Sequence, residues 1–187
     1  IQNASEWFGY KKAASDSVWI GIAPFAMHKT KIWPLENYPL LMQKLIDQFP
    51  VKFFLFGGGE KEIRYFDSLK EKFPTHTEVI AGQLKLRQEI SLMKHLDLML
   101  CVDSSNMHMA ALSGVPVLSI WGGTHPAVGF GPYGADANSI LQIDQAELPC
   151  RPCSVYGKEK CLRDDFACLT QLTPDLVAKS MLAKLKI

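Results

Sequence analysis

The chain has 187 residues, of which 48% are hydrophobic and 21% charged, and its formal net charge is +1. This balance is typical of a globular protein, and a net charge so close to zero argues against nucleic acid as a partner. The apolar runs are too short to span a membrane, and the opening residues "IQNASEWFGYKK" contain no signal-peptide hydrophobic segment, so we expect a cytoplasmic protein.

Short apolar runs recur along the chain and predict β-strands. The four strongest runs are Val18–Ala23, Val51–Phe56, Leu98–Val102 and Val115–Trp121. Two weaker candidates are "TEVIAG" at 77–82 and "SILQID" at 139–144. Because nearly every residue of the strong runs is apolar, we expect parallel strands that are buried on both faces.

Amphipathic segments lie between these runs and predict helices. They are Leu35–Gln48, Glu60–Phe73, Arg87–His95, Asn106–Ser113 and a last helix after the expected N-cap Thr173. Alternating strands and helices predict the α/β class, with a Rossmann-like, doubly wound parallel sheet and right-handed crossovers. The length favours a single domain, 1–187, with a leading segment at 1–17 and a cysteine-rich loop at 145–170.

Polar clusters follow four of the predicted strands. They are "PFAMHKTKIWP", "GGGEKE", "DSSNMHMAALSGVP" and "GGTHP". Ligands of open α/β sheets bind at the carboxyl ends of the strands, so these clusters are expected to share one edge. The chain has neither a P-loop motif nor the G-x-G-x-x-G dinucleotide fingerprint.

The third cluster predicts a site for a phosphate or diphosphate. If a helix starts at Asn106, its free amides and the hydroxyls of Ser104 and Ser105 form an anion site. Lys31, across the sheet edge, can neutralise the charge of the bound anion. The alternatives are that Asp103 or Ser104 merely caps the helix, that His108 is a core residue, and that Lys31 is a solvated loop charge. Glu60 can bind ribose hydroxyls or simply start a helix.

Four of the five cysteines crowd into one segment, as Cys150, Cys153, Cys161 and Cys168. Their spacing is compatible with a structural zinc site, although only the first pair has the tight C-x2-C spacing. Reduced thiols and a disulfide formed after purification are the alternatives. An odd number of cysteines favours a reducing compartment.

Four segments together resemble the C-terminal half of the lipopolysaccharide heptosyltransferases, which form glycosyltransferase family 9. They are "IGIAPFAMHKTKIWPLENY", "FLFGGGEKE", "DSSNMHMAALSGVPVLSIWGGTHPAVGFGPYG" and "CRPCSVYGKEKCLRDDFACLTQLTPDLV". The resemblance implies one half of a GT-B glycosyltransferase, which binds ADP-heptose and needs no metal for catalysis. The acceptor site and the general base are then expected in an N-terminal domain absent from this chain.

The resemblance also implies roles for individual residues. Lys31 matches the lysine that contacts the donor phosphates, and Glu60 the acid that binds ribose. The remaining substrate-binding positions that it implies are Ala26, Met27, Asp103, Ser104, Ser105, Asn106, His108, Gly123 and Thr124. Ser105 stands where the family usually has Gly, and Phe25 replaces the usual small residue.

The resemblance therefore implies an inverting transfer of heptose from ADP-heptose to a lipopolysaccharide core acceptor. Lys31 and the helix start at Asn106 are expected to stabilise the leaving diphosphate, and Lys31 is the one catalytic candidate. The chain on its own is expected to bind the donor and transfer nothing. The intact enzyme is expected in the cytoplasm, peripheral to the inner face of the membrane. A UDP-sugar enzyme of the epimerase kind and a non-catalytic nucleotide-binding module are the alternatives.

Overall fold

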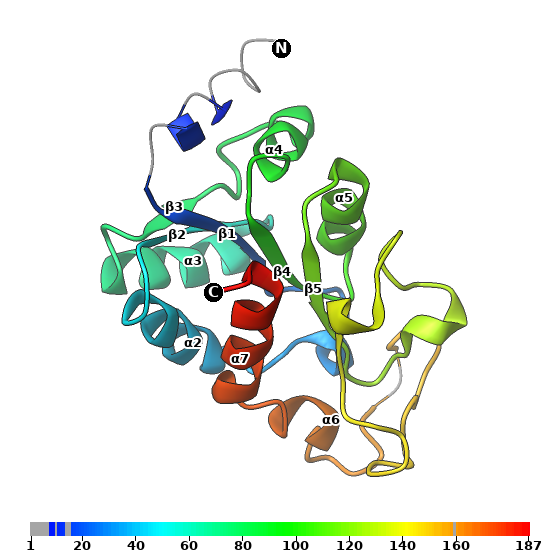
Figure 1. Ribbon diagram of the computed structural model, residues 1–187. Coiled ribbons are helices and arrows are strands. Elements are labelled where there is room, and N and C mark those ends of the chain that lie inside the picture. The colour runs from blue at the N-terminus through cyan, green and yellow to red at the C-terminus, as the bar shows by residue number, and fades with distance from the viewer. Residues whose placement is uncertain (1–7, 10, 14–15, 159) are drawn as a thin grey trace.

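The structure is a computed structural model that describes residues 8–9, 11–13, 16–158 and 160–187. Its centre is a six-stranded sheet in the order β3-β2-β1-β4-β5-β6, and every neighbouring pair is parallel (Figure 1). The strands are β1 (Val18–Ala23), β2 (Val51–Leu55), β3 (Thr77–Val79), β4 (Leu98–Val102), β5 (Val117–Ile120) and β6 (Ile140–Leu141). The prediction of a doubly wound, Rossmann-like α/β sheet is confirmed.

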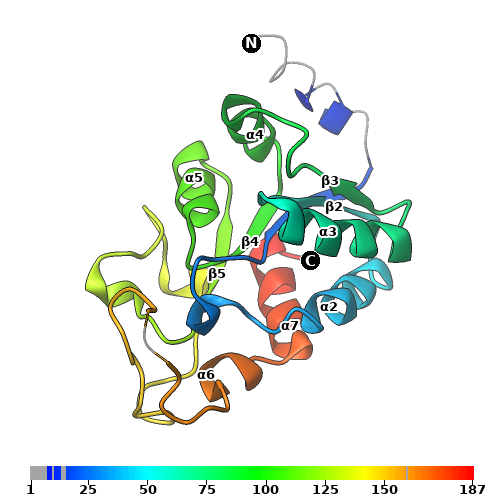
Figure 2. The ribbon, with the colours of Figure 1, turned by 180° about the vertical axis from the view of Figure 1, so that it is seen from behind.

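Both faces of the sheet are covered by helices (Figures 1 and 2). One face carries α4 (Leu86–Met93) and α5 (Ser105–Ser113), and the other carries α2 (Asn37–Ile46), α3 (Glu60–Lys72) and α7 (Pro174–Leu185). Successive strand residues alternate between the two cores, so that Trp19 and Met99 pack under α4 and α5 whereas Ile20 and Leu100 face the opposite side. This double burial explains why the strands are apolar on nearly every residue.

The predicted strand and helix boundaries hold to within a few residues. The run at Val115–Trp121 forms a strand only from Val117, after Pro116, which has no N–H to donate. The helix expected at Leu35–Gln48 spans Asn37–Ile46, with Pro39 in its first turn. The predicted cap of α7 is confirmed, because the Thr173 hydroxyl accepts a hydrogen bond from the Leu176 N–H.

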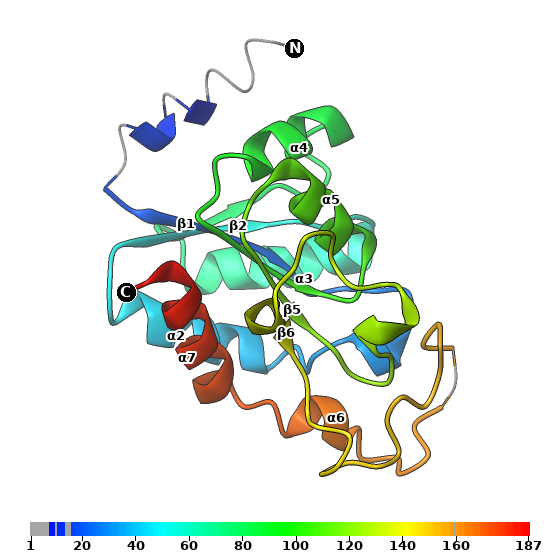
Figure 3. The same cartoon turned by 45° about the vertical axis from the view of Figure 1, so that its right-hand side comes forward.

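The segment between β5 and α7 contains little regular structure. It holds three short elements besides β6, namely the 3-10 turns η2 (Pro126–Val128) and η3 (Ala137–Ser139) and the helix α6 (Ala167–Thr170). The cysteine-rich loop expected at 145–170 is therefore a loop that ends in α6. Figure 3 shows this loop as a long irregular segment at one end of the molecule.

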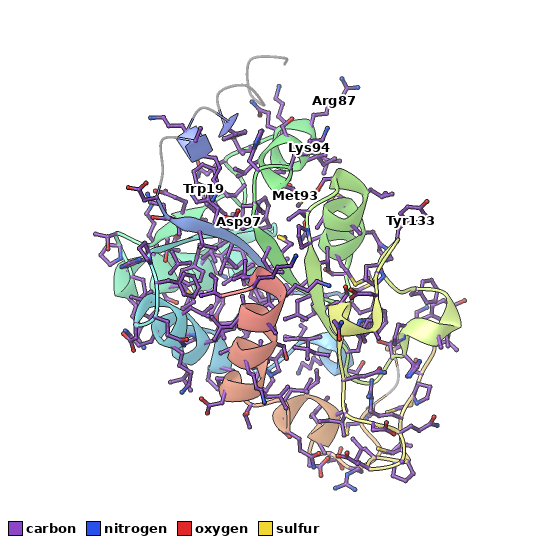
Figure 4. The ribbon with its side chains drawn as sticks, viewed as in Figure 1. Trp19, Arg87, Met93, Lys94, Asp97 and Tyr133 are labelled. Carbon is purple, nitrogen blue, oxygen red and sulfur yellow. The ribbon has the colours of Figure 1, made fainter. Side chains whose placement is uncertain are left out.

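The expected leading segment, 1–17, is described only in part. Within it, the Lys12 ammonium group pairs with the Asp97 carboxylate, which also accepts a hydrogen bond of 2.7 Å from the Trp19 N–H at the start of β1. Figure 4 shows Trp19 and Asp97 side by side. Among the described residues, none of the helices has the length and apolar character needed to cross a bilayer.

Candidate functional site

A cavity of about 660 Å³ opens at the carboxyl ends of β1, β2 and β4. Eight of the residues predicted to bind substrate line it: Ala26, Met27, Lys31, Asp103, Ser104, Ser105, Asn106 and His108. The wall is completed by Phe25, Gly57, Gly58, Glu62, Glu89, Met109 and Phe130. The structure therefore brings three of the four polar clusters to one cavity, as the strand order requires.

A buried ion pair lies in the wall of this cavity. Lys31 Nζ lies 2.8 Å from Asp103 Oδ2, and the two side chains are only 16% and 6% exposed. The Thr124 hydroxyl donates a hydrogen bond of 2.8 Å to the same carboxylate oxygen. Lys31 is therefore a fixed cation rather than a solvated loop charge, and its ammonium group can also contact an anion in the cavity.

Two distant segments hold the 3-10 turn η1 (Lys29–Lys31), which carries this lysine. The Gly123 N–H donates to the Thr30 carbonyl at 2.8 Å, and the Thr30 hydroxyl donates to the Gly157 carbonyl at 2.6 Å. A Cβ on Gly157 would lie 2.6 Å from Lys31 Cε. Gly157 belongs to the cysteine-rich loop, so that loop supports the lysine of the candidate site. The sequence gives no sign of this contact.

Gly123 and Thr124 do not line the cavity; they lie behind it. The buried Arg151 guanidinium holds their turn, because it donates to the Gly122 carbonyl at 2.7 Å, the Thr124 carbonyl at 3.2 Å and the Gln142 side chain at 3.0 Å. The two residues predicted at this turn therefore help to position Asp103 and η1, and their contact with a ligand stays a prediction.

The start of α5 contributes Ser104 to the cavity wall. Ser104 is the N-cap residue, but its side chain makes no capping hydrogen bond, and its buried hydroxyl oxygen has no partner among the residues that the structure describes. The structure therefore lacks the side-chain cap that was the alternative explanation for Ser104. The Met107 N–H donates to the Ser104 carbonyl at 3.2 Å, whereas the N–H groups of the first two residues of a helix have no partner within the helix. Ser105, which replaces the usual glycine, is exposed at the first helical position and leaves the cavity open.

The acid expected to bind ribose is not in the cavity wall. The Glu60 side chain is 91% exposed and lies 3.6 Å from Arg64 on the surface of α3. Glu62 lines the cavity instead and accepts a hydrogen bond of 2.8 Å from the Gly58 N–H. A Cβ on Gly57 would lie 2.4 Å from the Glu62 carboxylate, so any larger residue at position 57 would displace this acid.

Two further wall residues were missed by the sequence analysis. Glu89 lies in the first turn of α4. Phe130 follows η2, and its ring is tilted against that of Tyr156 with 5.8 Å between the ring centres. In the sequence, Glu89 occupies a position typical of the solvated face of a helix, so no pattern signals its role. His108 lines the cavity from α5 and is therefore not a core residue.

Comparison with known families decides what kind of protein has this cavity. Residues 2–159 match the family described as glycosyltransferase family 9 (heptosyltransferase). The chain belongs to glycosyltransferase family 9. It is 29% identical over 136 residues to lipooligosaccharide heptosyltransferase 2 of Haemophilus influenzae, an alignment that covers 69% of this chain and 38% of that protein.

Solved structures share the fold of this family 9 chain. ADP-heptose LPS heptosyltransferase II of E. coli matches with a TM-score of 0.73 at 21% identity, over 100% of this chain and 52% of that one. E. coli heptosyltransferase WaaC with ADP matches with a TM-score of 0.69 at 18% identity, over 96% and 48%. The chain therefore spans about half the length of the solved relatives and a smaller share of the curated one.

The cysteines of this family 9 chain are all free thiols. Within the described ranges, no three His, Cys, Asp or Glu side chains come together in a group that could hold a metal ion. Burial raises the pKa of Cys168 to about 11, and burial together with the thiols of Cys150 and Cys161 raises the pKa of Cys153. The zinc site stays a prediction, which metal analysis of the purified protein would test.

Proposed function

We propose that the intact protein is a heptosyltransferase that transfers heptose from ADP-heptose to a lipopolysaccharide core acceptor, and that this chain binds the donor. The observation that carries the proposal is the arrangement of one fixed cation and one set of free donors in a single cavity. Lys31 lies beside Asp103, and the Ser104 hydroxyl lies unpartnered at the start of α5. Such an arrangement fits the two phosphates of a nucleotide sugar.

In the proposed reaction, an acceptor hydroxyl oxygen attacks the anomeric carbon from the face opposite the diphosphate. The bond between this carbon and the diphosphate oxygen breaks, ADP leaves with the electron pair, and the configuration inverts. Negative charge grows on the diphosphate as the bond breaks, so the Lys31 ammonium group and the α5 amides stabilise the transition state more than the bound donor. No metal is assigned a role in this scheme.

Asp103 has a positioning part in this scheme. Its Oδ2 atom holds Lys31 and accepts from Thr124, so the lysine is fixed before the donor arrives. A group that is already in place costs no reorganisation when charge develops. The proton of the acceptor hydroxyl goes to a base outside this chain, since we assign the acceptor site to the remaining half of the protein.

The nucleoside is assigned to the β2 side of the cavity. Gly57 and Gly58 allow close approach of a ligand there, and the Glu62 carboxylate can accept hydrogen bonds from ribose hydroxyls. We therefore replace Glu60 by Glu62 as the ribose-binding acid. The lipid-linked acceptor implies a cytoplasmic enzyme that is peripheral to the inner face of the membrane, which is also part of this proposal.

Calorimetric titration with ADP and UDP tests the proposal. The chain is expected to bind ADP more tightly than UDP, and Lys31→Ala is expected to weaken ADP binding about tenfold to a hundredfold, because a charged hydrogen bond contributes about 1.5–3 kcal/mol. Lys29→Ala is the matched control, since Lys29 lies on the same turn but does not line the cavity. Preference for UDP would favour the epimerase-like alternative, and equal effects of the two substitutions would contradict the assignment of Lys31.

A further inference from the structure

Of the three acids in the cavity wall, Glu89 is the one whose side chain has no partner among the described residues. Glu62 accepts from the Gly58 N–H, and Asp103 is paired with Lys31 and Thr124. The Glu89 carboxylate has neither a hydrogen bond nor an ion pair with any residue that the structure describes, although it is half-buried against the cavity. It is therefore an acceptor that is free to bind a ligand.

The surroundings of Glu89 do not neutralise its charge. Burial raises the pKa of the Glu89 carboxyl above its usual range, which reflects lost hydration without a compensating partner. The nearest cation in sequence, Arg87, points outward from α4 and away from the sheet (Figure 4). A half-buried carboxylate of this kind gains most from a hydrogen-bond donor that arrives with the ligand.

The topology places Glu89 away from the phosphate-binding end of the cavity. Lys31 follows β1, and Asp103 and the start of α5 follow β4, so the diphosphate site lies over these two neighbouring strands. Gly57 and Gly58 follow β2, and α4 reaches the cavity from β3 at the edge of the sheet. A nucleotide whose diphosphate lies at Lys31 therefore directs its nucleoside toward the wall that contains Glu89.

We propose that Glu89 recognises the base of the nucleotide-sugar donor by accepting a hydrogen bond from the exocyclic amino group of adenine. This inference rests on the proposed function. Hypoxanthine has a carbonyl oxygen where adenine has its 6-amino group. A carboxylate that faces this position accepts a hydrogen bond from the amino group of adenine but repels the carbonyl oxygen of hypoxanthine, so Glu89 selects adenine over hypoxanthine.

The test compares ADP with inosine diphosphate, which has the same ribose and diphosphate. Dissociation constants are measured by calorimetry for the unmodified chain, Glu89→Leu, Glu89→Gln and Glu71→Gln. The unmodified chain is expected to prefer ADP by about tenfold or more, as expected for a site built to bond a polar group. Glu89→Leu is expected to bring the ratio of the two constants close to one, mainly by weakening ADP.

Two variants serve as controls. Glu89→Gln has nearly the same shape, and its amide can donate to the hypoxanthine carbonyl, so it is expected to bind inosine diphosphate better than Glu89→Leu does. Glu71→Gln removes an exposed acid of α3 that does not line the cavity, and it is expected to leave both constants unchanged. Thermal unfolding of each variant checks that the fold is intact, and the nearly isosteric glutamine keeps the test open if leucine disturbs α4.

The outcomes separate this inference from the proposed function. A preference for ADP that survives in both Glu89 variants overturns the inference and leaves the donor site standing. If Glu89→Leu weakens the binding of both nucleotides equally, the inference is also overturned, because Glu89 would then contact the ribose or diphosphate that the two nucleotides share. If the unmodified chain binds neither nucleotide, the proposed function fails and the inference falls with it.

Discussion

At the scale of single residues, the candidate site depends on close contacts between segments that are far apart in sequence. Lys31 is held by Asp103 on one side and packs against Gly157 on the other. Thr124 and Gly123 support this arrangement from behind the cavity wall. The charge that faces the proposed diphosphate is therefore placed by a glycine and a threonine that need not contact the ligand.

Gly157→Ala is expected to weaken ADP binding about tenfold. The added Cβ would lie 2.6 Å from Lys31 Cε, so the lysine must move away from its position beside Asp103. Gly129→Ala is the matched control, because both glycines have positive φ, 83° and 95°, but a Cβ on Gly129 meets nothing within 4 Å. Both variants are expected to lose about 1 kcal/mol of unfolding free energy, as for alanine at positive φ.

Calorimetry measures the ADP affinity of the Gly157 and Gly129 variants, and thermal unfolding measures their stability. The prediction for Gly157→Ala holds if only that variant loses ADP affinity while the two variants lose similar stability. An equal loss of affinity in the Gly129 variant would mean that backbone strain alone disturbs the site, and Lys31 would then have no special dependence on Gly157.

At the scale of elements, two helix starts with similar residues do different work. Thr173 caps α7 through the Leu176 N–H, whereas Ser104 at the start of α5 makes no capping bond and has a buried, unpartnered hydroxyl. A buried polar group without a partner costs free energy in the unliganded protein. We infer that α5 gives up the side-chain cap so that its hydroxyl and amides remain free for the diphosphate.

The contrast between the two caps predicts a separation of stability from binding. Thr173→Ala is expected to lower the free energy of unfolding by about 1 kcal/mol and leave ADP binding unchanged. Ser104→Ala is expected to leave stability unchanged within about 0.5 kcal/mol and weaken ADP binding severalfold. Chemical denaturation and calorimetry measure the two quantities, and a large stability loss in Ser104→Ala would show that the hydroxyl has a structural partner.

The connection between α7 and the β5–β6 edge predicts a pH effect. Hydrogen bonds from Ser139 and Lys184 hold the pKa of the Asp136 carboxyl below its usual value, which is about 3.9. Since the native pKa is the lower one, ionised Asp136 stabilises the fold above this range, and the contribution is lost as the pH falls through the native pKa. Asp136→Asn is therefore expected to lower the Tm at pH values near 7 and to have little effect near pH 2.

Calorimetric unfolding scans at the two pH values measure this effect. Because Asp136 is on the surface, the difference in Tm at neutral pH is expected to be small and to shrink in high salt. A difference that persists at low pH would indicate that the substitution acts through packing or the Ser139 hydroxyl rather than through the charge.

Periodicity predicted most elements, because strands buried on both faces and amphipathic helices leave clear patterns. Because the carboxyl ends of parallel strands meet at one edge of a sheet, the sequence also predicted that Lys31, Asp103 and the start of α5 lie close together. Sequence reasoning singled out Glu60, whereas Glu62 lines the cavity, because which acid faces the cavity depends on how α3 starts after Gly59. Gly157 and Glu89 were not predicted, since a loop contact across the chain and an acid on a helix leave no local signal.

At the scale of the whole molecule, the chain spans about half the length of its solved relatives. In the proposed scheme, its cavity binds the donor and stabilises the leaving diphosphate, and the acceptor site and the base come from the rest of the protein. The exposed Met27 lines the cavity, and so does Phe130, whose ring contacts that of Tyr156, so apolar surface is exposed at this site.

The central claim is that a nucleotide diphosphate lies between Lys31 and the start of α5. A crystal structure of the chain with ADP tests it most directly. We predict diphosphate oxygens within hydrogen-bond distance of Lys31 Nζ, the Ser104 hydroxyl and the first amides of α5. ADP bound in another cavity, or bound in this cavity with its adenine at Lys31, would contradict the proposed function.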